Sequence, residues 1–160
     1  YIGRVVNSWF PGYDDGLIRV ENSYWFTGPY IHSYSPPDTG YYPVNGYRSS
    51  PVGTVVCKSG MTTWLTCGYV LVKNETVNYS QGAVYGLTRH SACTEPGDSG
   101  GSNFSVISGR YYAEGMTSGA SLYWTGSRYV CGAKVGQPTY SWFQPIGPSL
   151  SYYGVTLTTQ

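Results

Sequence analysis

Short runs rich in β-branched and aromatic residues, separated by glycine, proline and asparagine, follow one another along most of this 160-residue chain. Such runs are typical of β-strands, and the residues between them are typical of tight turns. One short helix is expected over residues 148–153, because Gly154 follows as a helix-ending residue. The pattern predicts an all-β fold with strands at 5–10, 16–21, 24–27, 54–58, 65–73, 76–79, 83–89, 103–107, 111–117, 129–131, 141–146 and 155–158.

A segment without strand periodicity, residues 33–46, divides the chain into two unequal parts. Its prolines and glycines favour a loop. Residues 49–160 contain enough expected strands for one complete small β-barrel, and a chain of this length can bury a real core. Residues 1–48 contain enough strands for only part of another barrel.

The low charge of the chain excludes some partners. Charged residues make up 11% of the sequence, and the formal net charge is +1. Proteins that bind nucleic acid normally show a basic excess or cluster, so no nucleic-acid partner is expected. No run of about 18 apolar residues is present, so neither a transmembrane helix nor a membrane partner is expected.

Four cysteines bear on the compartment in which the protein folds. They show no CxxC or Cys/His metal spacing, which argues against a zinc site. An even count in a chain with few charges favours disulfide bonds and a secreted protein. Three pairings are open, of which the simplest joins neighbours along the chain, Cys57–Cys67 and Cys93–Cys131.

Residues 97–101 (GDSGG) place Ser99 in a turn between glycines. A serine hydroxyl becomes a nucleophile when a base takes its proton and N–H donors stabilise the oxyanion that forms. The glycines allow a sharp bend and let a substrate approach main-chain N–H groups. Ser99 is therefore the candidate nucleophile. The usual base is histidine, and neither His32 nor His90 occupies the expected place.

Several segments, in the same order along the chain, resemble the chymotrypsin-like serine proteases of the streptogrisin and α-lytic protease branch. They extend from about residue 3 to the end of the chain. The resemblance implies two six-stranded β-barrels with an active site between them, and a serine endopeptidase that forms an acyl-enzyme. It likewise implies no metal or organic cofactor, and it implies that residues 1–48 are the last part of a first barrel and the linker between the barrels. The matching segments are residues 10–14 (FPGYD), 56–63 (VCKSGMTT), 85–101 (YGLTRHSACTEPGDSGG), 116–119 (MTSG) and 143–145 (FQP).

The resemblance also implies roles for the catalytic residues. Asp14 would orient the base, with Asp15 as the alternative, and Ser99 would attack the scissile carbonyl. The backbone N–H groups of Gly97 and Ser99 would form the oxyanion hole, and Ser118 would donate a hydrogen bond to the aspartate.

A buried ion pair is implied next to the nucleophile. Lys58 would pair with Asp98 and fix the oxyanion loop, and the alternative is a solvated surface lysine. Lysine lacks the bidentate geometry of arginine, so the pair would be less rigid than an arginine pair.

The substrate-binding walls implied by the resemblance are Thr94, Glu95 and Pro96 on one side and Ser118, Gly119 and Ala120 on the other. An extended peptide would pair with residues 118–120 as an added strand. Ala120 stands where the family usually has glycine, and Glu95 is expected at the rim. No acidic residue is evident at the pocket base, so cleavage after arginine or lysine is not expected.

The segment between Gly119 and Cys131 is longer than the family usually shows. It contains Tyr123, Trp124 and Tyr129, which either form a lip over the extended site or pack on the barrel.

The family's histidine lies a few tens of residues before the aspartate, but only thirteen residues precede Asp14. His32 and His90 are expected to be ordinary histidines, exposed or partly satisfied. Part of a barrel alone would expose unpaired strand edges. We therefore expect a short companion chain, released by cleavage before Tyr1 and bound non-covalently, which completes the barrel and supplies the histidine. The alternative is a non-catalytic homologue that binds peptides or proteins.

Three asparagines begin an N-glycosylation pattern, which is short and often occurs by chance. They are Asn74, Asn78 and Asn103.

Overall fold

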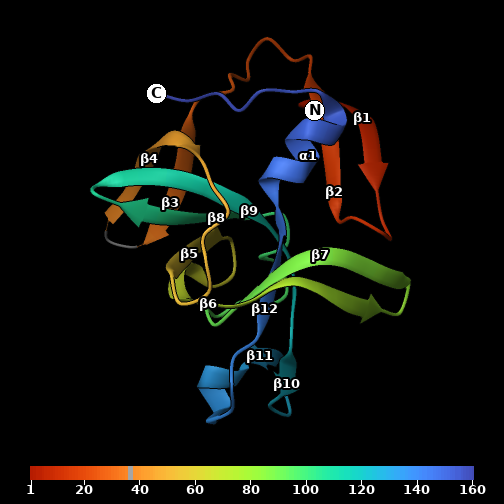
Figure 1. Ribbon diagram of the computed structural model, residues 1–160, viewed down its shortest axis with the longest axis vertical. Helices are drawn as coiled ribbons and strands as arrows, with labels where there is room; N and C mark the ends of the chain where they lie inside the picture. Colours follow the sequence, from red (N-terminus) through yellow and green to blue (C-terminus); the bar gives the residue numbers. More distant parts are fainter. Residues whose placement is uncertain (36–37) are drawn as a thin grey trace.

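The computed structural model describes residues 1–35 and 38–160, and strands dominate it (Figure 1). The all-β prediction is confirmed. No helix in the described part of the chain is long and apolar enough to cross a bilayer. The elements are β1 (Gly3–Trp9), β2 (Asp15–Val20), β3 (Tyr30–Ser35), β4 (Asp38–Tyr47), β5 (Val55–Gly60), β6 (Trp64–Tyr79), β7 (Gly82–His90), β8 (Ser102–Ile107), β9 (Arg110–Ala120), β10 (Leu122–Trp124), β11 (Tyr129–Cys131), the 3₁₀ helix η1 (Gly132–Val135), β12 (Ser141–Pro145) and α1 (Ile146–Tyr153).

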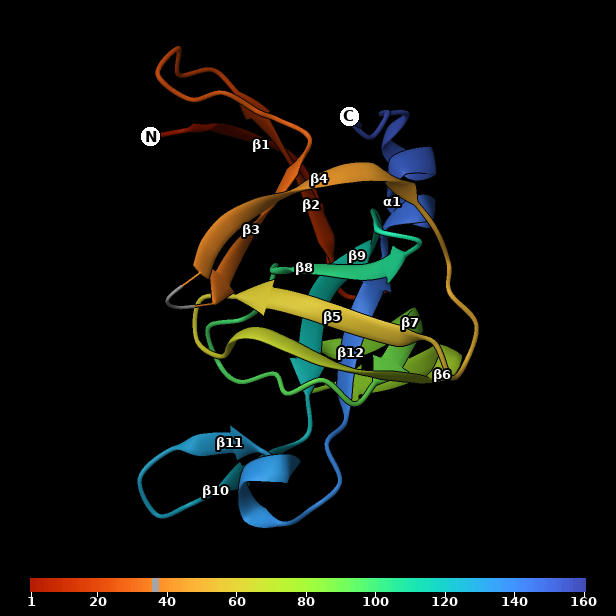
Figure 2. The same cartoon turned by 90° about the vertical axis from the view of Figure 1, so that its left-hand side faces the viewer.

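Six strands close into a barrel. Their hydrogen-bonded order is β12-β7-β6-β5-β8-β9, and β12 also pairs with β9, which closes the ring. All of these pairings are antiparallel, and the ribbon views show the six strands close together in the middle of the molecule (Figures 1 and 2). A closed barrel leaves none of its strands as an open edge.

The β3–β4 hairpin extends this sheet on its outside, where β4 pairs with β9 in parallel. We predicted a loop over 33–46, which is wrong for the described residues there. Along β3, Ile31 and Ser33 are buried whereas Tyr30 is exposed, which is the alternation of a half-buried strand. Turn residues obscured that alternation in the sequence, and two of them, Pro36 and Pro37, lie outside the described residues.

The expected division of the chain near residue 48 stays a prediction. We grouped residues 1–48 as the end of the first barrel with its linker, and 49–160 as the second barrel. By hydrogen bonding, β3 and β4 belong to the large sheet, because β3 pairs with β4 and β4 pairs with β9. The expected strands at 24–27 and 155–158 are absent, since neither segment has a pairing partner among the described residues.

β1 and β2 form a separate two-stranded sheet. Most of their side chains are exposed, including those of Val5, Val6 and Ile18. Gly12, in the turn between the strands, connects this hairpin to β7: its N–H donates to the Ala83 carbonyl, and its own carbonyl accepts from Tyr85 N–H.

Both disulfide bonds join neighbouring cysteines along the chain. Cys57 and Cys67 are opposite each other on β5 and β6, and Cys93–Cys131 connects the segment after β7 to β11. This is the simplest of the three pairings that the sequence leaves open. β10, β11 and η1 project from the end of the barrel that lies away from the β1–β2 hairpin (Figures 1 and 2).

His90 is completely buried at the end of β7, and among the described residues only one of its two ring nitrogens has a hydrogen-bond partner, so it is the partly satisfied histidine that was one of our two expectations. Its Nδ1 accepts a hydrogen bond from Ala92 N–H at 3.2 Å. Burial and, to a lesser degree, the nearby Lys58 charge lower the pKa of His90 from 6.5 to about 3. The imidazole is therefore neutral in the folded protein at neutral pH.

Acid should destabilise the protein through His90. Because its pKa is lower in the folded than in the unfolded chain, stability falls as the pH drops below 6.5 and continues to fall to about 3. Between pH 6 and pH 4 we expect a loss of about 2–3 kcal/mol, which urea unfolding at each pH measures. The loss should disappear in His90→Gln and persist in the control His32→Gln. If the free energy of unfolding depends on pH equally in the wild-type protein and in His90→Gln, the prediction is contradicted.

Candidate active site

The segment between β7 and β8 forms the tight turn that presents Ser99 at the surface. Gly97 has φ +101° and Gly100 has φ +79°, a backbone region that side chains disfavour. A Cβ at Gly97 would also lie 2.2 Å from the Thr62 hydroxyl oxygen, so only glycine fits there. This geometry explains the glycines around Ser99.

The backbone N–H groups of this turn point in two directions. Those of Asp98, Gly100 and Gly101 donate to carbonyls of Glu95, Thr117 and Asp98. Those of Gly97 and Ser99 donate to no acceptor within residues 1–35 and 38–160. Two free donors in the turn that contains the serine can stabilise an oxyanion formed there.

Lys58 and Asp98 form a fully buried ion pair behind this turn. The Nζ and Oδ2 atoms are 3.3 Å apart, and both side chains have an exposed fraction of 0%. Lys58 therefore does not lie at the surface, the alternative that the sequence left open. Its Nζ also donates to the Trp64 carbonyl at 3.0 Å.

Hydrogen bonds hold Asp98 in its ionised form. Its carboxylate accepts from the N–H groups of Thr62, Thr63 and Glu95 and from the Thr63 hydroxyl. Burial alone would raise the pKa of Asp98, but the Thr63 and Glu95 hydrogen bonds and the Lys58 charge outweigh it and lower the pKa. The charged pair thus fixes the backbone one residue before Ser99.

Asp14 lies between the hairpin and the barrel. Its Oδ2 accepts a hydrogen bond from the Ser118 hydroxyl at 2.6 Å, and its N–H donates to Oε1 of the buried Gln144 at 3.1 Å. Tyr79 is also hydrogen-bonded to Ser118, at 2.9 Å. Because the single Ser118 proton goes to Asp14, the Tyr79 hydroxyl is the donor to Ser118.

Asp15, the alternative to Asp14, points elsewhere. Its carboxylate accepts hydrogen bonds from Ser149 and Tyr153 on α1. Of the two carboxylates, only that of Asp14 bonds to Ser118.

A cleft of about 640 Å³ brings the candidate catalytic residues together. Ser99 comes from the turn before β8, Ser118 from β9 and Asp14 from the hairpin. Neither His32 nor His90 lines this cleft. The remaining lining residues are Phe10, Asp15, Gly16, Ile18, Tyr79, Gln81, Gly100, Met116 and Thr117.

The expected substrate walls lie in different environments. Thr94 is buried and Pro96 is exposed. Gly119 and Ala120 continue β9 beyond Ser118 and pair with β12 on one side. On the other side, β8 pairs with β9 only as far as Met116, so no strand in the described part of the chain covers residues 118–120 there. That free edge can accept an added strand.

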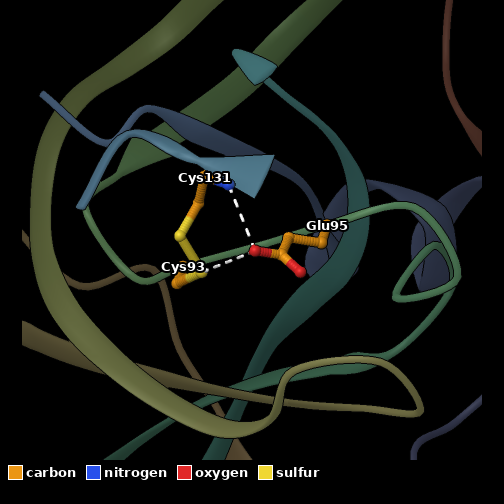
Figure 3. Close-up of side chains that lie close together, drawn as sticks. All are labelled: Cys93, Glu95 and Cys131. Atoms are coloured by element: carbon orange, nitrogen blue, oxygen red, sulfur yellow. Dashed lines mark hydrogen bonds between the residues drawn. A yellow bond between two sulfur atoms is a disulfide. The ribbon is translucent and has the colours of Figure 1, made fainter. Parts of the chain in front are cut away.

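Glu95 is not a rim residue, which corrects our expectation. Its side chain is 1% exposed, and its Oε1 accepts from Cys131 N–H at 3.2 Å, directly beside the Cys93–Cys131 disulfide (Figure 3). Lys134, on η1, approaches the same carboxylate at 2.6 Å. Glu95 therefore ties the segment after β10 to the nucleophile turn and does not face the cleft.

Cys93, Glu95 and Cys131 are also the one group of potential metal ligands in the described residues. The two sulfur atoms are bonded to each other, so neither is a thiolate that could hold a metal. No site for a metal is built from this group.

The exposure of the candidate glycosylation sites differs. Asn74 and Asn78 are exposed on β6. Asn103 has 1% of its surface exposed, and its Nδ2 donates to the Thr117 hydroxyl at 2.8 Å. Asn103 is therefore inaccessible to a glycosylating enzyme in the folded protein, which corrects that expectation.

Among the site residues that escaped the sequence analysis are Phe10 and Tyr79, which line the cleft, and Gln144, which binds Asp14. Phe10 and Gln144 lie in segments that resemble the family, so those segments were the available signal. Tyr79 had no signal, because it reaches Ser118 from 39 residues away.

The structure thus combines a closed β-barrel, an exposed serine beside two free N–H groups, and an aspartate that lines the same cleft. Comparison with known proteins finds similar sequences. Streptogrisin-C of Streptomyces griseus is 42% identical over 157 residues, which is 98% of this chain and 30% of that protein. Glutamyl endopeptidase 2 of the same organism is 34% identical, over 92% of this chain and 69% of that protein.

Solved structures agree with these sequence relatives. Protease A of Thermobifida fusca matches with a TM-score of 0.81 and 37% identity, covering 99% of this chain and 75% of that one. The chymotrypsin of Cellulomonas bogoriensis matches with a TM-score of 0.80 and 35% identity, and the match covers 99% of this chain and 76% of that one. No family model matches the sequence.

This chain belongs to the chymotrypsin-like serine protease family, in its streptogrisin branch. Its fold is the chymotrypsin-like double barrel, of which it contains the second barrel and, as β1 and β2, the last strands of the first. The chain spans 30% of streptogrisin-C and 46% of streptogrisin-A.

Proposed function

We propose that this chain is the nucleophile-bearing part of a secreted serine endopeptidase. The supporting observation is the cleft in which Ser99, with the free N–H groups of its turn, faces the Asp14–Ser118 pair. The two disulfide bonds suit an oxidising compartment outside the cell.

The proposed reaction is acyl transfer. Ser99 Oγ attacks the carbonyl carbon of the scissile bond while its proton passes to an imidazole, and the N–H groups of Gly97 and Ser99 stabilise the oxyanion. The C–N bond then breaks, the leaving amine takes the proton, and an ester on Ser99 remains. Water attacks this ester with the imidazole as base and releases the acid. Asp14 orients the imidazole.

The substrate would be an extended peptide. The side of β9 that β12 leaves open, at Ser118, Gly119 and Ala120, runs from the cleft and offers main-chain hydrogen bonds to such a chain. Thr94 and Pro96 lie on the opposite wall in this proposal.

The imidazole comes from polypeptide outside residues 1–160 in this proposal, since neither His32 nor His90 lines the cleft. We propose a short companion chain that pairs with the exposed β1–β2 hairpin and completes the first barrel. No cysteine is free to link it, so it would be bound non-covalently. Intact mass under denaturing conditions tests this: two species support the companion chain, and one species of 160 residues or one longer continuous chain contradicts it.

A fluorophosphonate, which reacts with activated serines, tests the enzymatic function. We expect stoichiometric labelling of Ser99 when the histidine-bearing segment is present, because the base then removes the Ser99 proton. Peptide mapping by mass spectrometry locates the label. Ser99→Ala should remain unlabelled, and Ser127→Ala, in the exposed segment after β10, should label as wild type does. An unlabelled, folded wild-type sample with that segment present would contradict the proposal.

A non-catalytic peptide-binding homologue is the second candidate. The observation that favours it is that no histidine within residues 1–35 and 38–160 lines the cleft. Binding of an extended peptide by the wild-type protein, without labelling or cleavage, would support this function.

A further inference from the structure

Asp15, the first residue of β2, is bound to α1 through both of its carboxylate oxygens. Oδ2 accepts from the Ser149 hydroxyl, and Oδ1 accepts from the Tyr153 hydroxyl at 2.5 Å. Ser149 and Tyr153 are four residues apart, so they lie on one face of the helix. We call these three residues the Asp15 cluster.

Consecutive residues of the hairpin therefore bind three different elements near the cleft. Asp14 bonds to Ser118 on β9 and to Gln144 on β12, whereas Asp15 bonds to α1. The backbone that joins Asp14 to Asp15 is held from both sides. A displacement of Asp15 would consequently displace Asp14.

The rest of the hairpin has few other attachments to the barrel. Most side chains of β1 and β2 are exposed. The backbone of Gly12 bonds to β7, and the ring of Trp9 packs against Tyr152 of α1 with centroids 4.5 Å apart. The attachments are thus concentrated in residues 9–15, beside the cleft, and Figure 1 shows the hairpin next to α1.

The environment of Tyr153 agrees with a hydroxyl that donates to a carboxylate. Burial, the hydrogen bond to Asp15 and the Asp15 charge together raise the pKa of Tyr153 to about 12. The phenol therefore stays protonated and remains a donor over the working range of a protein.

We propose that Asp15, Ser149 and Tyr153 are positioning residues for Asp14, so that the C-terminal helix sets the place of the aspartate that orients the base. This inference rests on the proposed function, because it assigns Asp14 a part in the reaction. Ser149 and Tyr153, the two residues of the cluster that the test replaces, do not line the cleft.

The test uses the protein isolated with its histidine-bearing segment, and compares Tyr153→Phe and Ser149→Ala with wild type. Each variant removes one donor to a carboxylate, a bond that typically contributes about a 10- to 100-fold equilibrium factor. Amide hydrogen exchange in β1 and β2 should become faster by about that factor, whereas exchange in β5 and β8 should not change. Tyr152→Phe, which keeps its ring against Trp9, is the matched control and should behave as wild type.

Kinetics separate positioning from a merely structural role. At a temperature where every variant is folded, we expect kcat to fall about 10-fold in Tyr153→Phe with KM within about twofold, because the substrate edge on β9 is untouched. NMR of ring-labelled tyrosine should show one titration near pH 12 that is absent in Tyr153→Phe and moves toward 10 in Asp15→Asn.

The outcomes distinguish this inference from the proposed function. If the fluorophosphonate labels Ser99 of the wild-type protein but kcat is unchanged in Tyr153→Phe and Ser149→Ala, the positioning role is overturned and the proposed function remains intact. Unchanged rates of amide hydrogen exchange in β1 and β2 of both variants would overturn the positioning role as well. A wild-type protein that does not label would remove the proposed function, and the positioning role with it.

Discussion

Replacing Ser99 by alanine is expected to lower kcat for peptide hydrolysis about 10⁶-fold, as removal of the nucleophile does in another serine protease. The reason is the loss of the covalent route, since no acyl ester can form without the hydroxyl. Residual turnover would come from the free N–H groups of the turn and from substrate binding. Initial rates at saturating peptide, measured with the histidine-bearing segment present, give the effect.

A second variant tests whether Ser99 and Asp14 act as one unit. Asp14→Ala alone should lower kcat about 10⁴-fold, because the base loses the group that orients it. The double variant Asp14→Ala/Ser99→Ala should be no slower than Ser99→Ala. Losses that multiply in the double variant would show that Asp14 does not act through the nucleophile. Ser127→Ala is the control for replacing an exposed serine outside the site.

Replacing Lys58 by methionine is expected to destabilise the protein by about 3–5 kcal/mol, because it leaves a buried charge without its partner. Asp98 is 0% exposed and has no other cation within 4 Å among the described residues. The hydrogen bonds from Thr62, Thr63 and Glu95 still favour its ionised form. Urea unfolding at neutral pH measures the loss.

The same change should also slow fluorophosphonate labelling of Ser99, because Asp98 positions the backbone that leads into the oxyanion turn. Lys58→Met/Asp98→Asn removes both charges and should recover at least part of the lost stability. Lys73→Met is the control: Lys73 forms hydrogen bonds to exposed Ser49, and its loss should cost less than about 1 kcal/mol. Equal stability of Lys58→Met and wild type would show that the ion pair does not stabilise the fold.

The sequence was most informative where the cause of structure is local. The strand–turn alternation over 54–58, 83–89 and 103–107 predicted β5, β7 and β8 to within a few residues, and Gly154 marked the end of α1. The glycines around Ser99 predicted a sharp turn because positive φ angles are a property of single residues.

Predictions failed where burial depends on distant parts of the chain. Glu95 was expected at a rim, but Lys134 and Cys131 of a later segment cover it. The sequence also did not show that His90 is fully buried, which follows from its place where β7 meets β6 and β12. Prolines and glycines suggested a loop where β4 instead pairs in parallel with β9, more than 60 residues along the chain.

By itself the sequence determined the all-β class, the order of most strands and, through its likeness to a protease family, the nucleophile turn. Strand periodicity and glycine conformation are local, so a linear pattern contains them. Only the tertiary structure decided that Asp14, and not its neighbour Asp15, bonds to Ser118, and that Asp15 binds α1. Asp14 and Asp15 have the same side chain and adjacent positions, so only their hydrogen-bond partners distinguish them. Those partners, Ser118 and Ser149, lie more than a hundred residues further along the chain.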